Sequence, residues 1–225
     1  MNLQEMIDVI RISTDDIDKD RLSDNQLIAL LNLSINKVFN LQMSLEYYPL
    51  ILSATATFVA NTQVTSIVAD TQVASLTKIR KLLMAEDENG VEIDIKAEVF
   101  SRKNISKRSV FVRTSRTELG YHINPSAGFV VYLTYVPAPE KFILNSSPGT
   151  TVLASIEEQY HDCVTNWATV LALGSDEQNL TTWTSIYQAS IQDMVESYTA
   201  KTETGQTVSD FYHGQNTDPR FSRLH

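Results

Sequence analysis

A capped amphipathic helix near the N-terminus constrains the fold more than any other segment. Ser23 stands three residues before Gln26, the spacing of a capping box, in which each side chain accepts a hydrogen bond from the other residue's backbone amide. Apolar residues then recur at helical spacing on one face, at Leu27, Leu31, Val38, Leu41 and Leu45. Tyr47, Tyr48 and Pro49 end the pattern. The sequence therefore predicts a long helix from Ser23 to about Leu45.

Helical periodicity also marks both ends of the chain. Leu3, Met6, Ile7 and Ile10 predict a short first helix. Ser155 and Glu158 have the spacing of a second capping box, and Gly174 is placed as a C-cap. The two apolar faces that follow Ser155 consist of Ile156, Tyr160, Cys163, Val164, Trp167 and Leu171, then of Leu180, Trp183, Tyr187, Ile191, Met194 and Tyr198. The short link at Ser175-Asp176 predicts an antiparallel hairpin with its aromatic residues mostly in the core.

The middle of the chain is rich in strand patterns. Alternation at Thr55–Val59 and the runs Lys78–Ala85 and Ser109–Arg113 each predict a strand. Residues 96–104 predict one or two helical turns. Pro137 and Pro139 end the sheet, because proline cannot donate to a strand ladder.

Two turns are predicted to join strands in this region. Asn89-Gly90 is typical of a type I′ turn, here leading into Val91–Ile95. Tyr121–Ile123 and Phe129–Val136 flank Pro125–Gly128, so they are predicted to form a hairpin.

These elements predict an α+β fold that is mainly helical. The N-terminal helices in residues 1–50 and a C-terminal helical hairpin in residues 151–200 would form one bundle. A β-rich region, residues 51–150, would be inserted into it, and residues 201–225 would form an extended tail.

The tail is polar, and terminal disorder is the default expectation for such a segment. It nevertheless contains residue types that anchor protein interfaces, namely Phe211, Tyr212, Arg220, Phe221 and Arg223. A polar segment with such anchors can become ordered on a partner, so these five residues are candidate docking anchors.

The formal net charge of -9 disfavours tight non-specific DNA binding. Residues 96–116 have the opposite net charge, +6, because they contain seven basic residues and a single acid, Glu98. The basic residues are Lys96, Arg102, Lys103, Lys107, Arg108, Arg113 and Arg116. Two interpretations remain open: a solvated loop, or an electrostatic contact with an acidic protein or a DNA backbone.

No catalytic, metal or cofactor site is predicted. Glu157 and His161 are four residues apart and could reach one metal ion, with Glu158 beside them, but no second histidine motif supplies further ligands. A solvated helix face is the expected role of these residues. The single cysteine, Cys163, lies on an apolar helix face and predicts a buried thiol. No Gly-rich phosphate loop and no G-x-S-x-G motif occurs.

No membrane association is expected either. The first residues combine early acids with a broken apolar pattern, which is not typical of a signal peptide. The longest strongly apolar stretch, Phe129–Val136, is too short to span a bilayer.

The order of these segments resembles the head-to-tail connector or adaptor (head completion) proteins of tailed bacteriophages. The resemblance is carried by LSDNQLIALLNLSINKVF, then GFVVYLTYVPAP, then SIEEQYHDCVTNWATVLAL with its Gly-Ser-Asp break, and a last helix ending near ESYTAK. It covers about residues 1–200.

This resemblance implies a structural virion protein, not an enzyme, and no catalytic residue or cofactor. It implies a homo-oligomeric ring, commonly of twelve copies, beneath the portal and around a channel for double-stranded DNA. The implied partners are the portal protein, tail or neck proteins and the chain itself, in the virion neck and, during assembly, in the host cytoplasm. Two alternatives remain: a tail-tube gatekeeper or minor tail protein, and a metal-dependent hydrolase centred on Glu157, Glu158 and His161.

Overall fold

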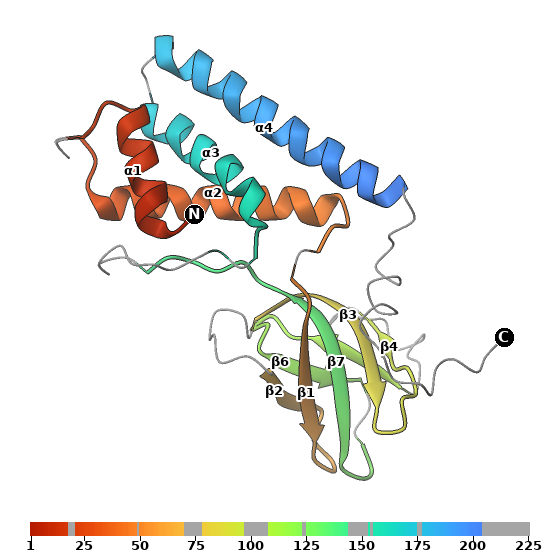
Figure 1. The fold of residues 1–225 in the computed structure, drawn as a ribbon. Helices are drawn as coiled ribbons and strands as arrows, with labels where there is room; N and C mark the ends of the chain where they lie inside the picture. The colour runs from red at the N-terminus through yellow and green to blue at the C-terminus, as the bar shows by residue number, and fades with distance from the viewer. Residues whose placement is uncertain are drawn as a thin grey trace.

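The computed structural model describes residues 1–17, 21–48, 50–69, 78–96, 108–122, 125–143, 153, 155–174 and 177–203. A layer of helices lies against one end of a curved sheet (Figure 1). The helices are α1 (Leu3–Ser13), α2 (Asp24–Ser44), α3 (His161–Leu173) and α4 (Glu177–Glu203). The strands are β1 (Leu52–Phe58), β2 (Val64–Ala69), β3 (Ile79–Asp87), β4 (Asp94–Ile95), β5 (Ser109–Val112), β6 (Glu118–Tyr121) and β7 (Phe129–Pro137).

The described strands form one mixed sheet of seven strands in the order β3-β7-β1-β2-β6-β5-β4. All neighbours are antiparallel except β4 and β5, which are parallel. The two edges approach each other, because the amide of Ile93 donates to the carbonyl of Ala85 at 2.8 Å and Glu86 bridges to Glu92. The sheet is therefore nearly closed into a barrel.

The prediction of a mainly helical bundle is wrong. Ala54, Ala56 and Phe58 alternate into the inside of the sheet, where they pack with buried residues of β3, β5, β6 and β7. This core is separate from the helical one, so the β region, which lies between α2 and α3 along the chain, is a second packed body and not an appendage of a helical bundle. The strands are short and mix small with polar residues, so the sequence pattern predicted less of the sheet than the structure has. It did not predict β2. The domain boundaries drawn from the sequence stay a prediction.

The N-terminal helices begin as their sequences indicate. The Ser23–Gln26 capping box is present: the amide of Ser23 donates to Gln26 Oε1 at 2.8 Å, and the amide of Gln26 donates to Ser23 Oγ at 3.3 Å. Helix α1 has a capping box of its own between Asn2 and Glu5, which sequence reasoning overlooked. Both N-termini therefore have their free amides satisfied locally.

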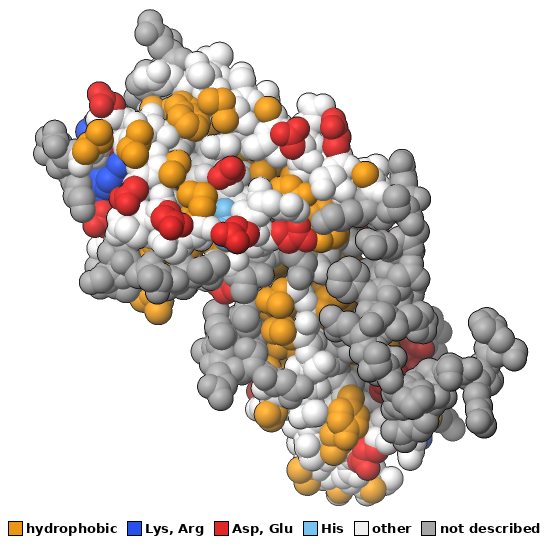
Figure 2. All heavy atoms as spheres, viewed as in Figure 1, with side chains coloured by type: hydrophobic (Ala, Val, Ile, Leu, Met, Phe, Trp, Pro, Cys, Tyr) orange, Lys and Arg blue, Asp and Glu red, His pale blue; other side chains and the backbone are white. Residues whose placement is uncertain are grey.

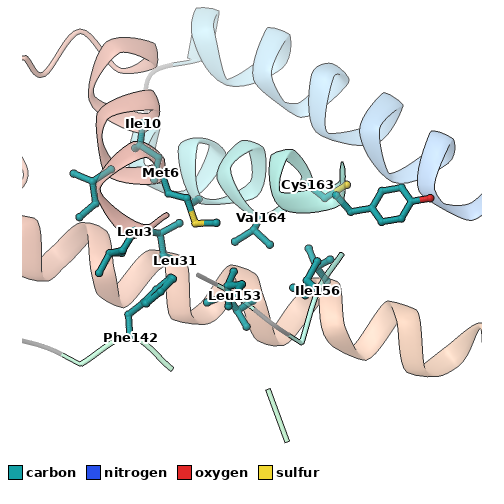
Figure 3. Close-up of a cluster of buried hydrophobic side chains, with 14 of the residues drawn as sticks. Leu3, Met6, Ile10, Leu31, Phe142, Leu153, Ile156, Cys163 and Val164 are labelled. Carbon is teal, nitrogen blue, oxygen red and sulfur yellow. The ribbon is translucent and has the colours of Figure 1, made fainter. Parts of the chain in front are cut away.

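The second predicted capping box is wrong. Helix α3 begins only at His161, after a 3₁₀ turn over Glu158–Tyr160, and it has no side-chain cap. The amide of Ser155 instead donates to Glu140 at 3.0 Å. Residues before the helix are held by tertiary packing: Figure 3 shows Phe142, Leu153 and Ile156 among side chains of α1, α2 and α3.

The C-terminal hairpin is confirmed, since α4 runs back along α3 (Figure 1). Trp167 and Tyr187 meet between the two helices with ring centroids 4.7 Å apart. Lys37 of α2 places its ammonium 3.1 Å from the centre of the Trp167 ring, a cation–π contact that ties the hairpin to α2. Tyr187 and Tyr198 are buried, as expected for core aromatics.

Both turn predictions are corrected. The amide of Gly90 donates to the carbonyl of Asp87 at 2.9 Å, and Gly90 alone of the two turn residues has positive φ, at 72°. This is a type I turn followed by a left-handed glycine, not type I′. The predicted hairpin around Pro125–Gly128 does not form either, because β6 pairs with β2 and β5 whereas β7 pairs with β1 and β3.

The described helices include none with the length and apolar character needed to cross a bilayer. The helical turns expected at residues 96–104 lie almost entirely outside the described residues.

Candidate binding surfaces

The predicted basic cluster is spread along one edge of the sheet. Arg108 precedes β5 and pairs with Asp87 at 2.9 Å, while Lys96 lies 3.7 Å from Asp94. Arg113 and Arg116 follow β5, at its other end. Arg102, Lys103 and Lys107 lie outside the described residues. The structure thus does not gather the described members at one point, and their contact with a partner stays a prediction.

Asp87 organises the turn at the Arg108 end. Its carboxylate accepts the amides of Asn89 at 2.9 Å and Val91 at 3.0 Å. These backbone hydrogen bonds, with the nearby Arg108 guanidinium, hold the pKa of Asp87 below its usual range. Arg108 is therefore already matched by a charge of its own chain.

Arg116 belongs to a different surface, a cavity of about 510 Å³ between α2 and the sheet. We call it the waist pocket. It is lined by Asn36, Asn40, Lys78, Arg80, Thr114, Ser115, Arg116, Ala138, Pro139 and Lys141. Four of these residues are cationic and none is anionic, so the pocket carries a concentrated positive charge.

Four segments that are distant in sequence build this pocket. The amide of Ile79 donates to the carbonyl of Arg116 at 2.9 Å, which joins the β5–β6 turn to the start of β3. The amide of Ala138 donates to the carbonyl of Lys78 at 2.7 Å and adds the end of β7. Arg80 donates to Asn40 Oδ1 of α2 at 3.0 Å.

Helix α2 also holds the stretch that follows β7. The side chain of Asn32 donates to the carbonyl of Phe142 at 2.9 Å and accepts its amide at 2.8 Å. This two-way contact holds the neighbouring Lys141 against the helix. Hydrogen bonds therefore hold the segments that bound the pocket to one another.

Among the described residues, the four cations of the pocket have no carboxylate partner. Within the part of the chain that the structure describes, no Asp or Glu oxygen lies within ion-pair distance of Lys78, Arg80, Arg116 or Lys141. All four side chains are exposed. Like charges held together without a counter-charge favour binding of an anion.

Sequence reasoning found only Arg116 among these four. Lys78 and Arg80 belong to a predicted strand, and Lys141 follows the sheet, so no spacing along the chain groups them. The pairing of β3 with β7, the hydrogen bond from Ile79 to Arg116 and the docking of Phe142 on α2 bring them together.

The outer helices carry the opposite charge. Helices α1, α3 and α4 (as far as Ala200) contain a single Lys or Arg, which is Arg11. The Arg11 side chain is buried. Exposed acids lie at Glu158 and Asp162 before and in α3, and at Asp193 and Glu196 in α4. Figure 2 shows acidic side chains gathered over this lobe, with Lys and Arg at one end of it.

Asp162 and Asp193 lie close to the same point of the α3–α4 contact. Cys163 between them is buried, and its thiol donates to the carbonyl of Ser190 at 3.3 Å. Burial raises the pKa of the Cys163 thiol, and the charges of Asp162 and Asp193 raise it further. The buried thiol expected from the sequence is confirmed. We call Glu158, Asp162, Asp193 and Glu196 the acidic seam.

Glu158 and His161 meet at the Met1 amine, which lies 3.1 Å from His161 Nδ1, whereas Glu157 has other partners. Glu157 accepts hydrogen bonds from Tyr47 and Gln159, while Glu158 pairs with the Met1 amine at 3.2 Å. His161 is fully buried and its Nε2 donates to the carbonyl of Ile156 at 3.1 Å. The expected solvated face is therefore wrong for His161. No cluster of three His, Cys, Asp or Glu side chains suited to a metal ion occurs among the described residues.

The candidate tail anchors Phe211, Tyr212, Arg220, Phe221 and Arg223 lie outside the described residues. Docking by the tail therefore stays a prediction.

Comparison with known proteins gives one family. The family model described as SU10 adaptor protein matches residues 1–209, which include both the helical layer and the sheet. No curated protein matches the chain.

Proposed function

The chain belongs to the SU10 adaptor protein family, and on this premise we propose that it is the head-to-tail adaptor that forms a ring beneath the portal. Membership makes the protein a structural phage adaptor and a component of the virion, and it points to a structural and not an enzymatic role. In the proposed ring, the protein connects capsid to tail in the virion neck and lines the channel for double-stranded DNA.

The observation that carries the proposal is the extent of the family match. It runs through residue 209 and so covers all the described elements of both cores. The net charge of -9 also suits a channel wall, because such a surface repels phosphate and lets DNA pass without holding it.

The portal is the proposed main partner, and residues 201–225 are the proposed docking segment. Aromatic and arginine side chains are the residue types that dominate binding energy at interfaces, and the tail contains five of them. A tail that becomes ordered only on its partner loses conformational entropy on assembly and not on folding.

Mixing the purified chain with rings of the cognate portal tests this proposal. Co-sedimentation and negative-stain imaging are expected to show an added ring of density below the portal. A chain lacking residues 205–225 is expected to unfold at the same denaturant concentration but to leave the portal bare. If the full chain binds tails and ignores portal rings, the protein is a gatekeeper or minor tail protein instead.

A further inference from the structure

The waist pocket is built to receive an anion that the described part of the chain does not provide. Lys78, Arg80, Arg116 and Lys141 surround a cavity of about 510 Å³, and none has a carboxylate partner there. Asparagine and hydroxyl side chains complete the lining, and Asn36 and Ser115 already donate to Asn32 and Glu118, so the four cations are the groups that would bind a ligand. Arginine matches the planar geometry of a carboxylate with two parallel hydrogen bonds.

The backbone at Arg116 supports a role beyond folding. Arg116 has φ of 60°, the left-handed region in which an arginine is strained and a glycine is not. Asp15, Glu46 and Asn61 also have positive φ, and Arg116 is distinguished from them by its place in the lining of the pocket. Strain of this kind is concentrated where a side chain has a function.

Charge and shape identify the anion as protein carboxylates and not DNA phosphate. The pocket is recessed between α2 and the sheet, whereas a DNA duplex presents a broad convex surface that would also meet the acidic helices. Carboxylates that protrude from a helix can enter such a recess. The acidic seam offers exposed carboxylates from Glu158, Asp162, Asp193 and Glu196, on α4 as far as Ala200 and on and just before α3, which contain no Lys or Arg of their own.

We propose that the waist pocket of one copy of this chain binds the acidic seam of a second copy. The two surfaces differ, so the contact is head-to-tail, and each added copy leaves one pocket and one seam open until a ring closes. This inference rests on the proposed ring function and supplies an interface for it. The four cations then face the carboxylates of Asp162, Asp193 and Glu196, with Glu158 already paired to the Met1 amine, and the contact is sensitive to salt.

Sedimentation velocity of the full chain at low and high salt tests the contact. The wild-type chain is expected to associate at low salt and to dissociate at high salt. Reversing two charges of the pocket (Arg80→Glu with Arg116→Glu) is expected to weaken association by more than about tenfold, because attraction becomes repulsion. Reversing two charges of the seam (Asp162→Lys with Asp193→Lys) is expected to weaken it similarly.

Mixing the two double variants provides the decisive measurement. Each is defective alone, but the reversed pocket of one matches the reversed seam of the other, so the mixture is expected to associate. Lys81→Glu and Asp8→Lys serve as controls, since each reverses one exposed charge, half the change of a double variant, at a position outside both surfaces. Circular dichroism and thermal unfolding confirm that each variant is folded.

Three results would overturn the inference. They are a wild-type chain that stays monomeric at low salt at every attainable concentration, double variants that associate like wild type, and a mixture that does not associate.

Fluorescence anisotropy with a short DNA duplex tests the competing ligand, DNA phosphate. DNA binding that the reversed pocket abolishes would assign the pocket to phosphate. A wild-type chain that binds the portal but does not self-associate overturns this inference alone, whereas self-association without portal binding overturns the proposed function.

Discussion

At the scale of single residues, a buried ion pair closes the connection between α1 and α2. Arg11 is 4% exposed and Asp16 is 3% exposed. Arg11 donates to Asp16 at 3.0 Å and to Asp24 at 2.6 Å, and Asp16 also accepts the amides of Arg21 and Leu22. One carboxylate thus holds a guanidinium and two backbone amides.

Replacing Asp16 tests this network. Asp16→Asn leaves Arg11 buried with a weaker partner, and we expect the free energy of unfolding to fall by about 3 kcal/mol, the low end for a broken buried pair, because Asp24 remains. Urea denaturation measures the loss. Asp15→Asn is the control: the neighbouring side chain is exposed, so we expect a change within about 0.5 kcal/mol. Equal losses in the two variants would contradict the role of the pair.

The same residue predicts a pH dependence. Burial acts to raise the pKa of Asp16, but the amides of Arg21 and Leu22 and the charge of Arg11 outweigh it and lower the pKa below its usual value near 3.8. A lowered folded-state pKa stabilises the protein above the unfolded-state pKa, and this stabilisation disappears as pH falls through the folded-state value. Urea curves of wild type and Asp16→Asn are therefore expected to converge below about pH 4. A constant difference between pH 7 and pH 3 would exclude this origin.

At the scale of elements, a glycine in β6 accommodates an aromatic ring. Gly120 pairs with Phe111 of β5, and a Cβ built on Gly120 would lie 2.2 Å from Phe111 Cζ. The Phe111 ring therefore lies over the glycine and also meets His122, with centroids 4.5 Å apart. Gly120 is required here by close approach and not by its backbone angles.

Gly120→Ala is expected to force the Phe111 ring out of place. Overpacking of this kind costs about 1–3 kcal/mol in the free energy of unfolding. Adding Phe111→Leu should recover part of the loss, because the smaller side chain leaves room for the methyl group. A double-mutant cycle from urea denaturation measures the coupling, and additive effects of the two substitutions would count against this contact.

Local signals determined how much of the fold could be predicted. The Ser23–Gln26 box and the apolar face after it lie within one segment, and α2 was predicted correctly. Ser155 and Glu158 have the same spacing, yet Ile156 and Leu153 are drawn into the helical core and the helix begins five residues later than predicted. Strand partners depend on contacts between distant segments, so β6 and β7 were paired with each other incorrectly.

At the scale of the whole molecule, acidic and basic side chains lie on different surfaces. The outer helices display acids, and the junction of α2 with the sheet displays the four cations of the waist pocket. The pocket could not be predicted, because its cations come from three segments that are united by β3–β7 pairing, the hydrogen bond from Ile79 to Arg116 and α2 docking. Arg116 was found through the basic stretch, but its neighbours there, Arg113 and Arg108, face other acids of the sheet.

Arg116→Gly is expected to separate the stability of the fold from its assembly. Left-handed backbone costs an L-residue about 1–2 kcal/mol, and the added freedom of glycine in the unfolded chain offsets about 0.5–1 kcal/mol of the relief. We therefore expect the free energy of unfolding to rise by roughly 0.5–1 kcal/mol. The same change removes one of four pocket cations, so self-association at low salt should weaken.

Arg116→Lys is the matched control for this substitution. It retains both the positive charge and the strained backbone, so stability should stay close to that of wild type and self-association should weaken less than in the glycine variant. Urea denaturation and sedimentation velocity measure the two properties independently on the same samples. A glycine variant that is more stable and assembles less would show that the fold retains a strained arginine for the contact between copies. A variant that is less stable would mean that the Arg116 side chain supports the turn itself.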